Sequence, residues 1–155
     1  MNSPLPRKAF QFAFVVDDVD AYLRKFAALF GMETPGTSVT DPREVTHIRY
    51  LGQPTEGRAR VGYIQLDNVL LELIEPIGGP SIWQACLEAR GNGLHHIAFI
   101  VDGIEQVIAD LEGLGLPLVQ SGKFPAAGPV PSGLYAYLGG LETLGFDVEL
   151  LEMGR

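Results

Sequence analysis

The sequence contains a single cysteine, Cys86, among its 155 residues. One cysteine can form neither a disulfide within the chain nor a metal site of several cysteines. Long apolar runs are also missing: none approaches the roughly 18 to 20 residues of a membrane-spanning helix, and none follows the N-terminal charges as in a secretory signal. Basic residues are few, 11 against 19 acidic ones for a net charge of −8, and they form no stripe of the kind that nucleic-acid binding requires. We therefore expect a single-domain, cytoplasmic protein whose partner is a small molecule, with no nucleic acid and no membrane.

What the sequence does contain is an internal repeat. Residues 11–17 (QFAFVVD) and 96–102 (HIAFIVD) align at an offset of 85, and each is a strand-like run that ends at an Asp able to cap a helix. Apolar residues follow at helical spacing in both copies, and Gly31 and Gly115 stand where the two helices would end. The apolar positions are Val19, Tyr22, Leu23 and Phe26, with the counterparts Ile104, Val107, Ile108 and Leu111. This shared order indicates a duplication.

Strand-like segments complete each copy. They span residues 45–51, 59–66 and 69–76 in the first copy, and residues 116–120, 134–138 and 146–151 in the second. Both copies close with the pattern Glu-Leu-x-Glu. The sequence therefore predicts an α+β fold of two βαβββ modules, residues 9–77 and 93–153. Residues 78–92 are the expected linker, in which Ser81 caps a short helix over 82–89, and the Gly/Pro-rich segment 122–133 is either a lid or an irregular connection.

The alternation of side chains along strands places four polar residues together. The bulky faces of the first strands are the natural seats of the helices, which leaves Gln11 and His96 on the helix-free side. Leu71 and Leu73 place Glu72 on that side too, and Val148 and Leu150 do the same for Glu149. A carboxylate inside such an apolar strand is costly to desolvate unless it is paired or bound to a cation. We thus expect one concave surface to carry four candidate metal ligands: Gln11, Glu72, His96 and Glu149.

The types of these side chains indicate which ion they would hold. An imidazole, two carboxylates and an amide oxygen suit a divalent ion in octahedral coordination with two waters better than a closed structural zinc site. Taken singly, each residue has a plainer explanation: a strand glutamate can face water, and a strand histidine is often structural, as we expect of His95. The prediction also assumes that no bulge shifts the alternation.

At these residues the sequence resembles a known family. The segments GLHHIAFIVDGI (93–104) and LELIEP (71–76) are similar to those of the vicinal oxygen chelate superfamily, which includes glyoxalase I, methylmalonyl-CoA epimerase, extradiol dioxygenases and bleomycin resistance proteins. The resemblance covers residues 9–153. It implies paired βαβββ modules in a curved, barrel-like mixed sheet with helices outside, in a chain that forms a homodimer. It also implies that Gln11, Glu72, His96 and Glu149 hold a divalent metal ion (Zn, Ni, Co, Mn or Fe).

The resemblance further implies an activity. We expect a metal-dependent, glyoxalase-like lyase or isomerase that removes a proton next to a carbonyl, like lactoylglutathione lyase or methylmalonyl-CoA epimerase. Glu149 would be base and ligand, with Glu72 as the partner that returns the proton. Glyoxalase I usually carries an Arg where this chain has Val15, and the epimerases tend to have His and Gln in place of Gln11 and Glu72. Dioxygenase chemistry on iron usually needs two histidines, so His47 would have to join the site.

Two further questions are left open by the sequence. An anionic substrate would need basic residues at the rim of the site, and the candidates are Arg49, Arg58, Arg60 and Lys123. The alternative is that these four residues are ordinary solvated charges. The alternative function is metal-free binding of a small molecule, as in antibiotic-resistance proteins of the same fold, and the aromatic residues Phe124, Tyr135 and Tyr137 are compatible with such a pocket.

Overall fold

The computed structural model describes residues 3–154, and in this part of the chain ten strands form one mixed sheet accompanied by five helices. The elements of the first half and the linker are β1 (Gln11–Val15), α1 (Val19–Phe30), β2 (Thr37–Val39), α2 (Arg43–Thr46), β3 (Arg49–Tyr50), β4 (Gln53–Pro54), β5 (Gly57–Gln65), β6 (Leu70–Gly78) and α3 (Ile82–Arg90). Those of the second half are β7 (Gly93–Ile100), α4 (Ile104–Gly113), β8 (Leu118–Phe124), β9 (Gly133–Leu138), α5 (Leu141–Leu144) and β10 (Asp147–Met153).

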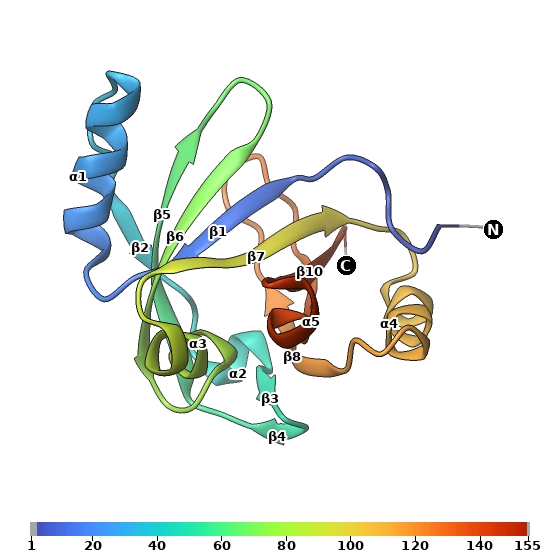
Figure 1. Cartoon of the computed structure of the whole chain (residues 1–155). Coiled ribbons are helices and arrows are strands. Elements are labelled where there is room, and N and C mark those ends of the chain that lie inside the picture. Colours follow the sequence, from blue (N-terminus) through green and yellow to red (C-terminus); the bar gives the residue numbers. More distant parts are fainter. Residues whose placement is uncertain (1–2, 155) are drawn as a thin grey trace.

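The strand order expresses the sequence repeat. It runs β2-β5-β6-β1-β7-β10-β9-β8-β3-β4, so that the first strands of the two halves lie side by side in the middle of the sheet. Each first strand pairs in parallel with the last strand of its own half, β1 with β6 and β7 with β10, whereas β1 and β7 are antiparallel. The sheet curls into a half-barrel, with α1 and α4 at opposite sides of its outer face (Figure 1). This is the predicted α+β fold.

The second glutamate of each Glu-Leu-x-Glu pattern secures the helix of its own half. Glu75 Oε2 accepts a hydrogen bond from the backbone N–H of Val19 at the start of α1, at 2.9 Å. Glu152 Oε1 accepts one from the N–H of Gly103, directly before α4, at 2.7 Å. A carboxylate at a helix N-terminus satisfies a free N–H group and lies at the positive end of the helix dipole. The repeated pattern therefore ties the last strand of each half to its helix.

The helix ends correct one expectation and agree with another. The N-cap of α1 is Asp18, whose Oδ1 accepts from Ala21 N at 2.9 Å, so the capping aspartate is one residue later than Asp17. The N-cap of α4 is Gly103, which makes no side-chain cap, so Asp102 does not cap this helix as expected. Gly31 ends α1 in the left-handed conformation (φ 64°) that glycine adopts without steric cost.

The segment between β2 and β5 departs most from the predicted strands. Residues 45–51 were expected to form one strand, but they contain the end of α2 and the two-residue strand β3. His47 and Leu51 both have a φ of 50°, a left-handed conformation that interrupts an extended chain. The β3–β4 hairpin crosses to the other half and pairs with β8, while the short β2 takes the place beside β5.

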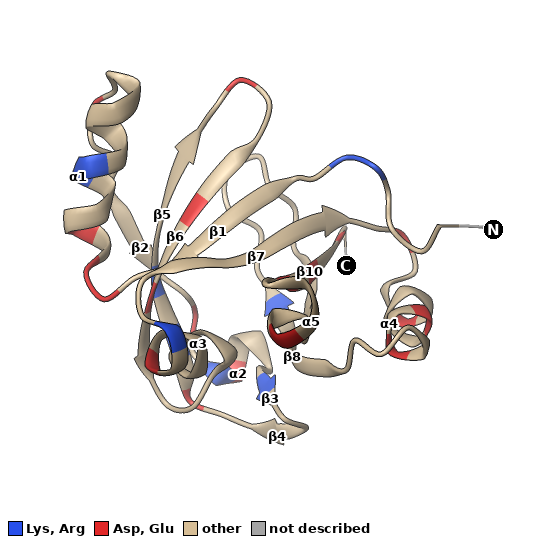
Figure 2. Cartoon of the chain, in the orientation of Figure 1, with Lys and Arg blue, Asp and Glu red and all other residues tan. Residues whose placement is uncertain are grey.

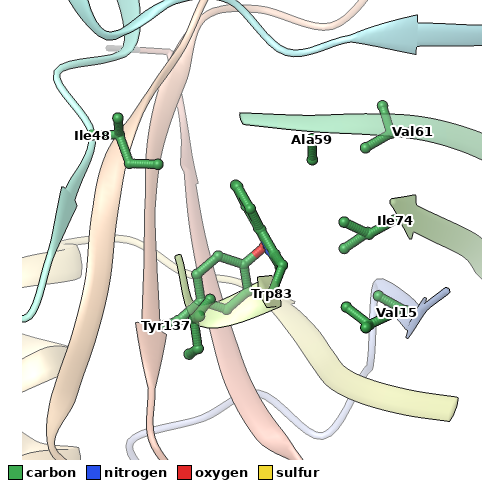
Figure 3. Packing of buried hydrophobic residues seen from close by; sticks show 9 residues of the cluster. Val15, Ile48, Ala59, Val61, Ile74, Trp83 and Tyr137 are labelled. Carbon is green, nitrogen blue, oxygen red and sulfur yellow. The ribbon is translucent and has the colours of Figure 1, made fainter. Parts of the chain in front are cut away.

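The two faces of the sheet are covered by different apolar clusters. On the outer face, α1 packs over β5 and β6, and α4 packs over β9 and β10. The inner face has its own apolar cluster, in which Trp83 of α3 and Tyr137 of β9 lie between Ile48 on one side and the strands of the first half on the other (Figure 3). The strand residues of this cluster are Val15, Ala59, Val61 and Ile74. Helix α3 thus covers one end of the inner face.

Within the described part of the chain, the Lys and Arg positions do not gather into one stripe along the ribbon (Figure 2). Acidic segments predominate, and the Lys and Arg positions are scattered over elements that include α1, α2, α3 and β3 (Figure 2). Among residues 3–154, none of the helices combines the length and apolar character that crossing a bilayer requires.

Candidate functional site

Four polar side chains, here called the quartet, lie on the inner face of the central strands. They are Gln11 on β1, Glu72 on β6, His96 on β7 and Glu149 on β10. Two alanines lie between them: Ala13 is paired with both Glu72 and His96, and Ala98 is paired with both Gln11 and Glu149. Paired residues point to the same face of a sheet, and alanine has no side chain beyond Cβ. The long side chains therefore meet above the two alanines.

The quartet side chains are in direct contact and almost fully buried. The Gln11 amide nitrogen Nε2 donates a hydrogen bond to Glu72 Oε2. His96 Nε2 lies 3.0 Å from Glu149 Oε2 and 3.6 Å from Glu72 Oε2. None of the four residues exposes more than 8% of its surface, and His96 exposes none. The fold thus brings the four predicted residues of a single chain to one buried point.

Burial dominates the protonation of the quartet. It raises the pKa of Glu72 to about 7, a shift that His96 opposes and Glu149 increases. Burial also raises the pKa of Glu149 to about 7, against the hydrogen bond from Tyr137. The pKa of His96 is lowered to about 4 by burial, although Glu72 acts in the opposite direction. At neutral pH the imidazole is therefore uncharged, and each carboxyl group is close to the midpoint of its titration.

A tyrosine accompanies each carboxyl group on the neighbouring strand. Tyr63 on β5 is paired with Glu72, and Tyr137 on β9 is paired with Glu149. Each tyrosine hydroxyl is hydrogen-bonded to its carboxyl group. The Tyr137 oxygen also accepts a hydrogen bond of 3.2 Å from Trp83 Nε1. Tyr63 was not predicted from the sequence, although the alternation of side chains along residues 59–66 places it on the inner face.

Two further buried polar residues stand behind His96. A β-bulge in β7 makes His95 an extra residue between those paired with Ala13 and Phe14, and it turns the His95 ring inward as well. His95 Nδ1 lies 2.9 Å from His96 Nδ1, and His95 Nε2 lies 3.3 Å from Asp147 Oδ2. His95 was expected from the sequence to be structural. Asp147, which shares the alternation of Glu149 along β10, was not predicted.

The donor types of the quartet fit a divalent ion, although the side chains now contact one another. His96 Nε2 is buried and makes no hydrogen bond of acceptable geometry, and it faces two carboxylate oxygens. One imidazole nitrogen and several oxygens are a common donor set for Zn, Ni, Co, Mn or Fe. Within residues 3–154, no group of three or more His, Cys, Asp or Glu side chains is already spaced to hold a metal ion. An ion would have to replace the direct contacts between His96 and the two acids.

Two surface pockets lie apart from the quartet. The larger has a volume of about 450 Å³ and is lined by Arg43, Glu44, His47, Ile48, Arg49 and Pro54. The smaller, of about 240 Å³, shares His47 and includes Lys123 and Tyr135. The Tyr135 ring packs against that of Tyr137, with 5.7 Å between the two ring centres. His47, which a two-histidine iron site would need, is exposed in these pockets.

Of the four basic residues predicted at the rim, two are bound to other groups of the protein and two line the surface pockets. Arg58 donates two hydrogen bonds to the carbonyl of Thr40, at 2.8 and 2.6 Å, and Arg60 forms an ion pair of 2.7 Å with Asp20. These two arginines therefore hold the fold around β5. Arg49 and Lys123 instead line the two pockets.

Solved structures with similar folds include two of methylmalonyl-CoA epimerases. The enzyme from Mycobacterium tuberculosis has 16% sequence identity and a TM-score of 0.63, with 100% of this chain and 93% of that chain covered. A single-residue variant of the Streptomyces coelicolor enzyme, in complex with 2-nitronate-propionyl-CoA, has 21% identity and a TM-score of 0.61, with coverages of 96% and 98%. At these identities the likeness establishes the fold.

Sequence comparison gives the family. The Bacillus subtilis protein YqjC, itself uncharacterised, is 34% identical over 121 residues, which are 74% of this chain and 84% of YqjC. The sequence profile of the Glyoxalase/Bleomycin resistance protein/Dioxygenase superfamily matches residues 10–131. The chain therefore belongs to the glyoxalase/bleomycin resistance protein/dioxygenase superfamily, the vicinal oxygen chelate superfamily that its motifs resemble.

Proposed function

We propose that this protein is a divalent-metal-dependent enzyme of the lyase or isomerase type, which removes a proton from a carbon next to a carbonyl group. The observation that carries the proposal is the convergence of the quartet, with His96 Nε2 at 3.0 and 3.6 Å from two buried carboxyl groups. Two buried acids side by side are costly unless a proton or a cation separates them. Gln11, Glu72, His96 and Glu149 are the residues that would hold this cation.

The metal would supply one part of the chemistry. A bound divalent ion polarises a carbonyl oxygen and stabilises the negative charge that develops on it when the neighbouring proton leaves. The protein supplies the rest through the two acids. Glu149 is the proposed base, because burial raises its pKa to about 7, where a group both accepts and releases protons readily at neutral pH. Tyr137 orients this carboxyl group by its hydrogen bond.

The symmetry of the site favours isomerisation. Glu72 and Tyr63 repeat the arrangement of Glu149 and Tyr137 from the other half of the chain. One acid can therefore take a proton from one face of the substrate while the other returns a proton to the opposite face. The structural likeness to methylmalonyl-CoA epimerases supports this reading. Glyoxalase I carries a glutathione-binding Arg at the position of Val15. In this chain Val15 is fully buried in the inner apolar cluster, so this position offers no charge to glutathione.

The residues that line the larger surface pocket indicate a negatively charged substrate. Arg43, Arg49 and His47 line a hollow of about 450 Å³ together with one acid, Glu44, and Arg43 also forms a 2.7 Å ion pair with Glu56. Such a hollow fits the anionic part of an acyl thioester. The neighbouring pocket includes Tyr135, whose ring packs against Tyr137, the tyrosine hydrogen-bonded to Glu149, so we place the reactive end of the same molecule on this side of the site.

Metal analysis of protein purified without chelators tests the metal. We expect about one divalent ion per chain, and we expect Glu149→Gln and His96→Ala to bind the ion more weakly and to lose it during purification. Glu152→Gln is the matched control. Glu152 is a buried acid on β10, like Glu149, but its carboxylate binds the backbone at the N-terminus of α4.

Deuterium exchange tests the reaction. Acyl-CoA esters and hemithioacetals incubated with the loaded enzyme in D₂O are expected to take up deuterium next to the carbonyl group, as read by NMR. A metal-free protein that exchanges none of these substrates contradicts the proposal. If such a protein binds drugs with quenching of Trp83, the single tryptophan, which contacts Tyr137, the alternative of a metal-free binding protein holds instead.

A further inference from the structure

The two adjacent histidines share one hydrogen between them. Both rings are completely buried, an environment that favours the neutral imidazole with one N–H group. Their Nδ1 atoms are 2.9 Å apart, a distance at which one nitrogen must donate and the other accept. Either His96 donates, which leaves its Nε2 with a free lone pair, or His95 donates, which puts the proton of His96 on Nε2.

Asp147 decides between these two arrangements. Its Oδ2 lies 3.3 Å from His95 Nε2, and neither atom has a hydrogen-bonding partner of regular geometry elsewhere in residues 3–154. A carboxylate oxygen can only accept, so it favours the form of His95 with its proton on Nε2. His95 Nδ1 is then an acceptor, and the His96 proton must lie on Nδ1.

The orientation of Asp147 is itself fixed. Its other oxygen, Oδ1, accepts hydrogen bonds from the backbone N–H groups of Gly140 at 2.8 Å and Leu141 at 3.2 Å. Asp147 and His95 are 2% and 0% exposed, so water does not compete for the contact between them. The chain of groups therefore runs from a backbone anchor through one acid and two imidazoles to the quartet.

We infer that Asp147 and His95 are positioning residues that set the tautomer of His96, with its proton on Nδ1 and its lone pair on Nε2 turned toward Glu72 and Glu149. This inference rests on the proposed function for its use, because a metal ligand must present a lone pair. Metal-binding histidines are commonly oriented by a carboxylate or carbonyl on their other nitrogen. Here the carboxylate acts through a second imidazole.

The tautomers can be read directly in the wild-type protein. Long-range ¹H–¹⁵N correlation spectra distinguish the protonated nitrogen of each imidazole, and the chain has only three histidines, with exposed His47 as an internal reference. In metal-free protein we expect the proton of His95 on Nε2 and that of His96 on Nδ1. The opposite pair of tautomers overturns the inference, and this measurement needs no variant.

Asp147→Asn replaces the hydrogen-bond acceptor that faces His95 Nε2 with a donor, and it barely changes the shape of the side chain. The two backbone N–H groups hold the amide oxygen in the place of Oδ1, so the new NH₂ group faces His95 Nε2 and donates to it. We expect both histidines to change tautomer and the affinity for Zn²⁺ to fall about 10- to 100-fold by calorimetry. Glu152→Gln, a buried acid on the same strand, is expected to change neither.

The outcomes separate this inference from the proposed function. If Asp147→Asn leaves the tautomers unchanged, Asp147 does not set them and the inference fails even when Zn²⁺ binds. If the wild-type tautomers are as stated and Asp147→Asn inverts them, the inference holds. A failure of that same protein to bind any divalent ion then counts against the proposed function alone.

Discussion

At the scale of single residues, protons and a cation compete for the same atoms of the candidate site. Glu72 and Glu149 each have a pKa raised to about 7 by burial, so below neutral pH they are largely protonated when no metal is bound. A metal ion needs them as carboxylates and must displace those protons. We therefore expect divalent-metal affinity to rise with pH up to about 7 and to level off above it.

Calorimetry across pH measures this dependence. Each displaced proton weakens binding roughly tenfold for every pH unit below about 7, and titrations in buffers of different ionisation enthalpy count the protons released. Glu149→Gln removes one of the two groups, so the slope that remains is expected to be about one proton smaller. An affinity that stays constant between about pH 5.5 and about pH 8 contradicts the raised pKa values.

Glu149 is also the proposed base, and its removal has a second expected result. Glu149→Gln keeps the size of the side chain but takes away the group that accepts the proton. General base catalysis contributes about 10²- to 10⁴-fold, so we expect deuterium exchange to slow by at least that factor at saturating metal. Glu152→Gln is expected to keep the wild-type rate. Exchange by the Glu149→Gln protein at more than a tenth of that rate would assign the base elsewhere.

The quartet could be located from the sequence because each of its residues lies in a stretch of regular alternation, which for His96 begins directly after the bulge in β7. His95 could not, because its inward position depends on a bulge that one sequence does not reveal. Asp147 follows the alternation of Glu149, but an acid at the start of a strand has no distinguishing mark until its partner His95 is known. Single residues were therefore predictable where the backbone is regular.

At the scale of elements, helix α1 is held on the sheet by a close approach to β5. Leu23 is fully buried over Gly62, and a Cβ atom at that glycine would overlap the terminal carbons of the leucine. We expect Gly62→Ala to lower the free energy of unfolding by about 1–3 kcal/mol, because the fully buried Leu23 must shift within its apolar cluster to make room. Urea denaturation measures this change.

The matched control is another glycine within a strand. Gly93 in β7 has no atom within 4 Å of the place that a Cβ would occupy, and its φ is not positive. Gly93→Ala is therefore expected to leave the free energy of unfolding within about 0.5 kcal/mol of wild type. Equal losses in the two variants would show that the cost comes from the strand backbone and not from Leu23.

Elements were predictable where a periodic pattern is long. The helical spacing of Val19–Phe26 and the apolar runs of β5, β6, β9 and β10 led to the correct elements. Residues 45–51 were misread as one strand because this stretch contains the end of a short helix and a strand of two residues, with left-handed residues at His47 and Leu51. The pairing of β3 with β8 in the other half depends on tertiary contacts that no local pattern carries.

At the scale of the whole molecule, the candidate site joins the two halves of one chain. Gln11 and Glu72 come from the first half, and His96 and Glu149 come from the second, across the β1–β7 pair. A site completed within one chain needs no residue from another subunit. We still expect a homodimer, as the family resemblance implies, but we expect metal affinity to be independent of protein concentration through the range in which the dimer dissociates.

A metal ion that bridges the halves stabilises the folded state of the entire chain. Binding at about 100 times the dissociation constant adds about 2.7 kcal/mol by mass action. In a domain of this size, 1 kcal/mol raises the melting temperature by about 2–4 °C, so we expect a rise of about 5–10 °C when chelator-treated protein is given the metal. Calorimetric scans measure it, and a single transition is expected because the two halves share one sheet.

The variants determine whether this stabilisation comes from the quartet. At the metal concentration that stabilises the wild type, His96→Ala and Glu149→Gln, which bind the ion more weakly, are expected to show no rise in melting temperature, while Glu152→Gln, which leaves the quartet intact, keeps it. An ion bound at surface acids would raise the melting temperature of all three variants equally, and the quartet would then not be the metal site. If the rise were confined to one of two separate transitions, the ion would lie within one half, which contradicts a site built from both.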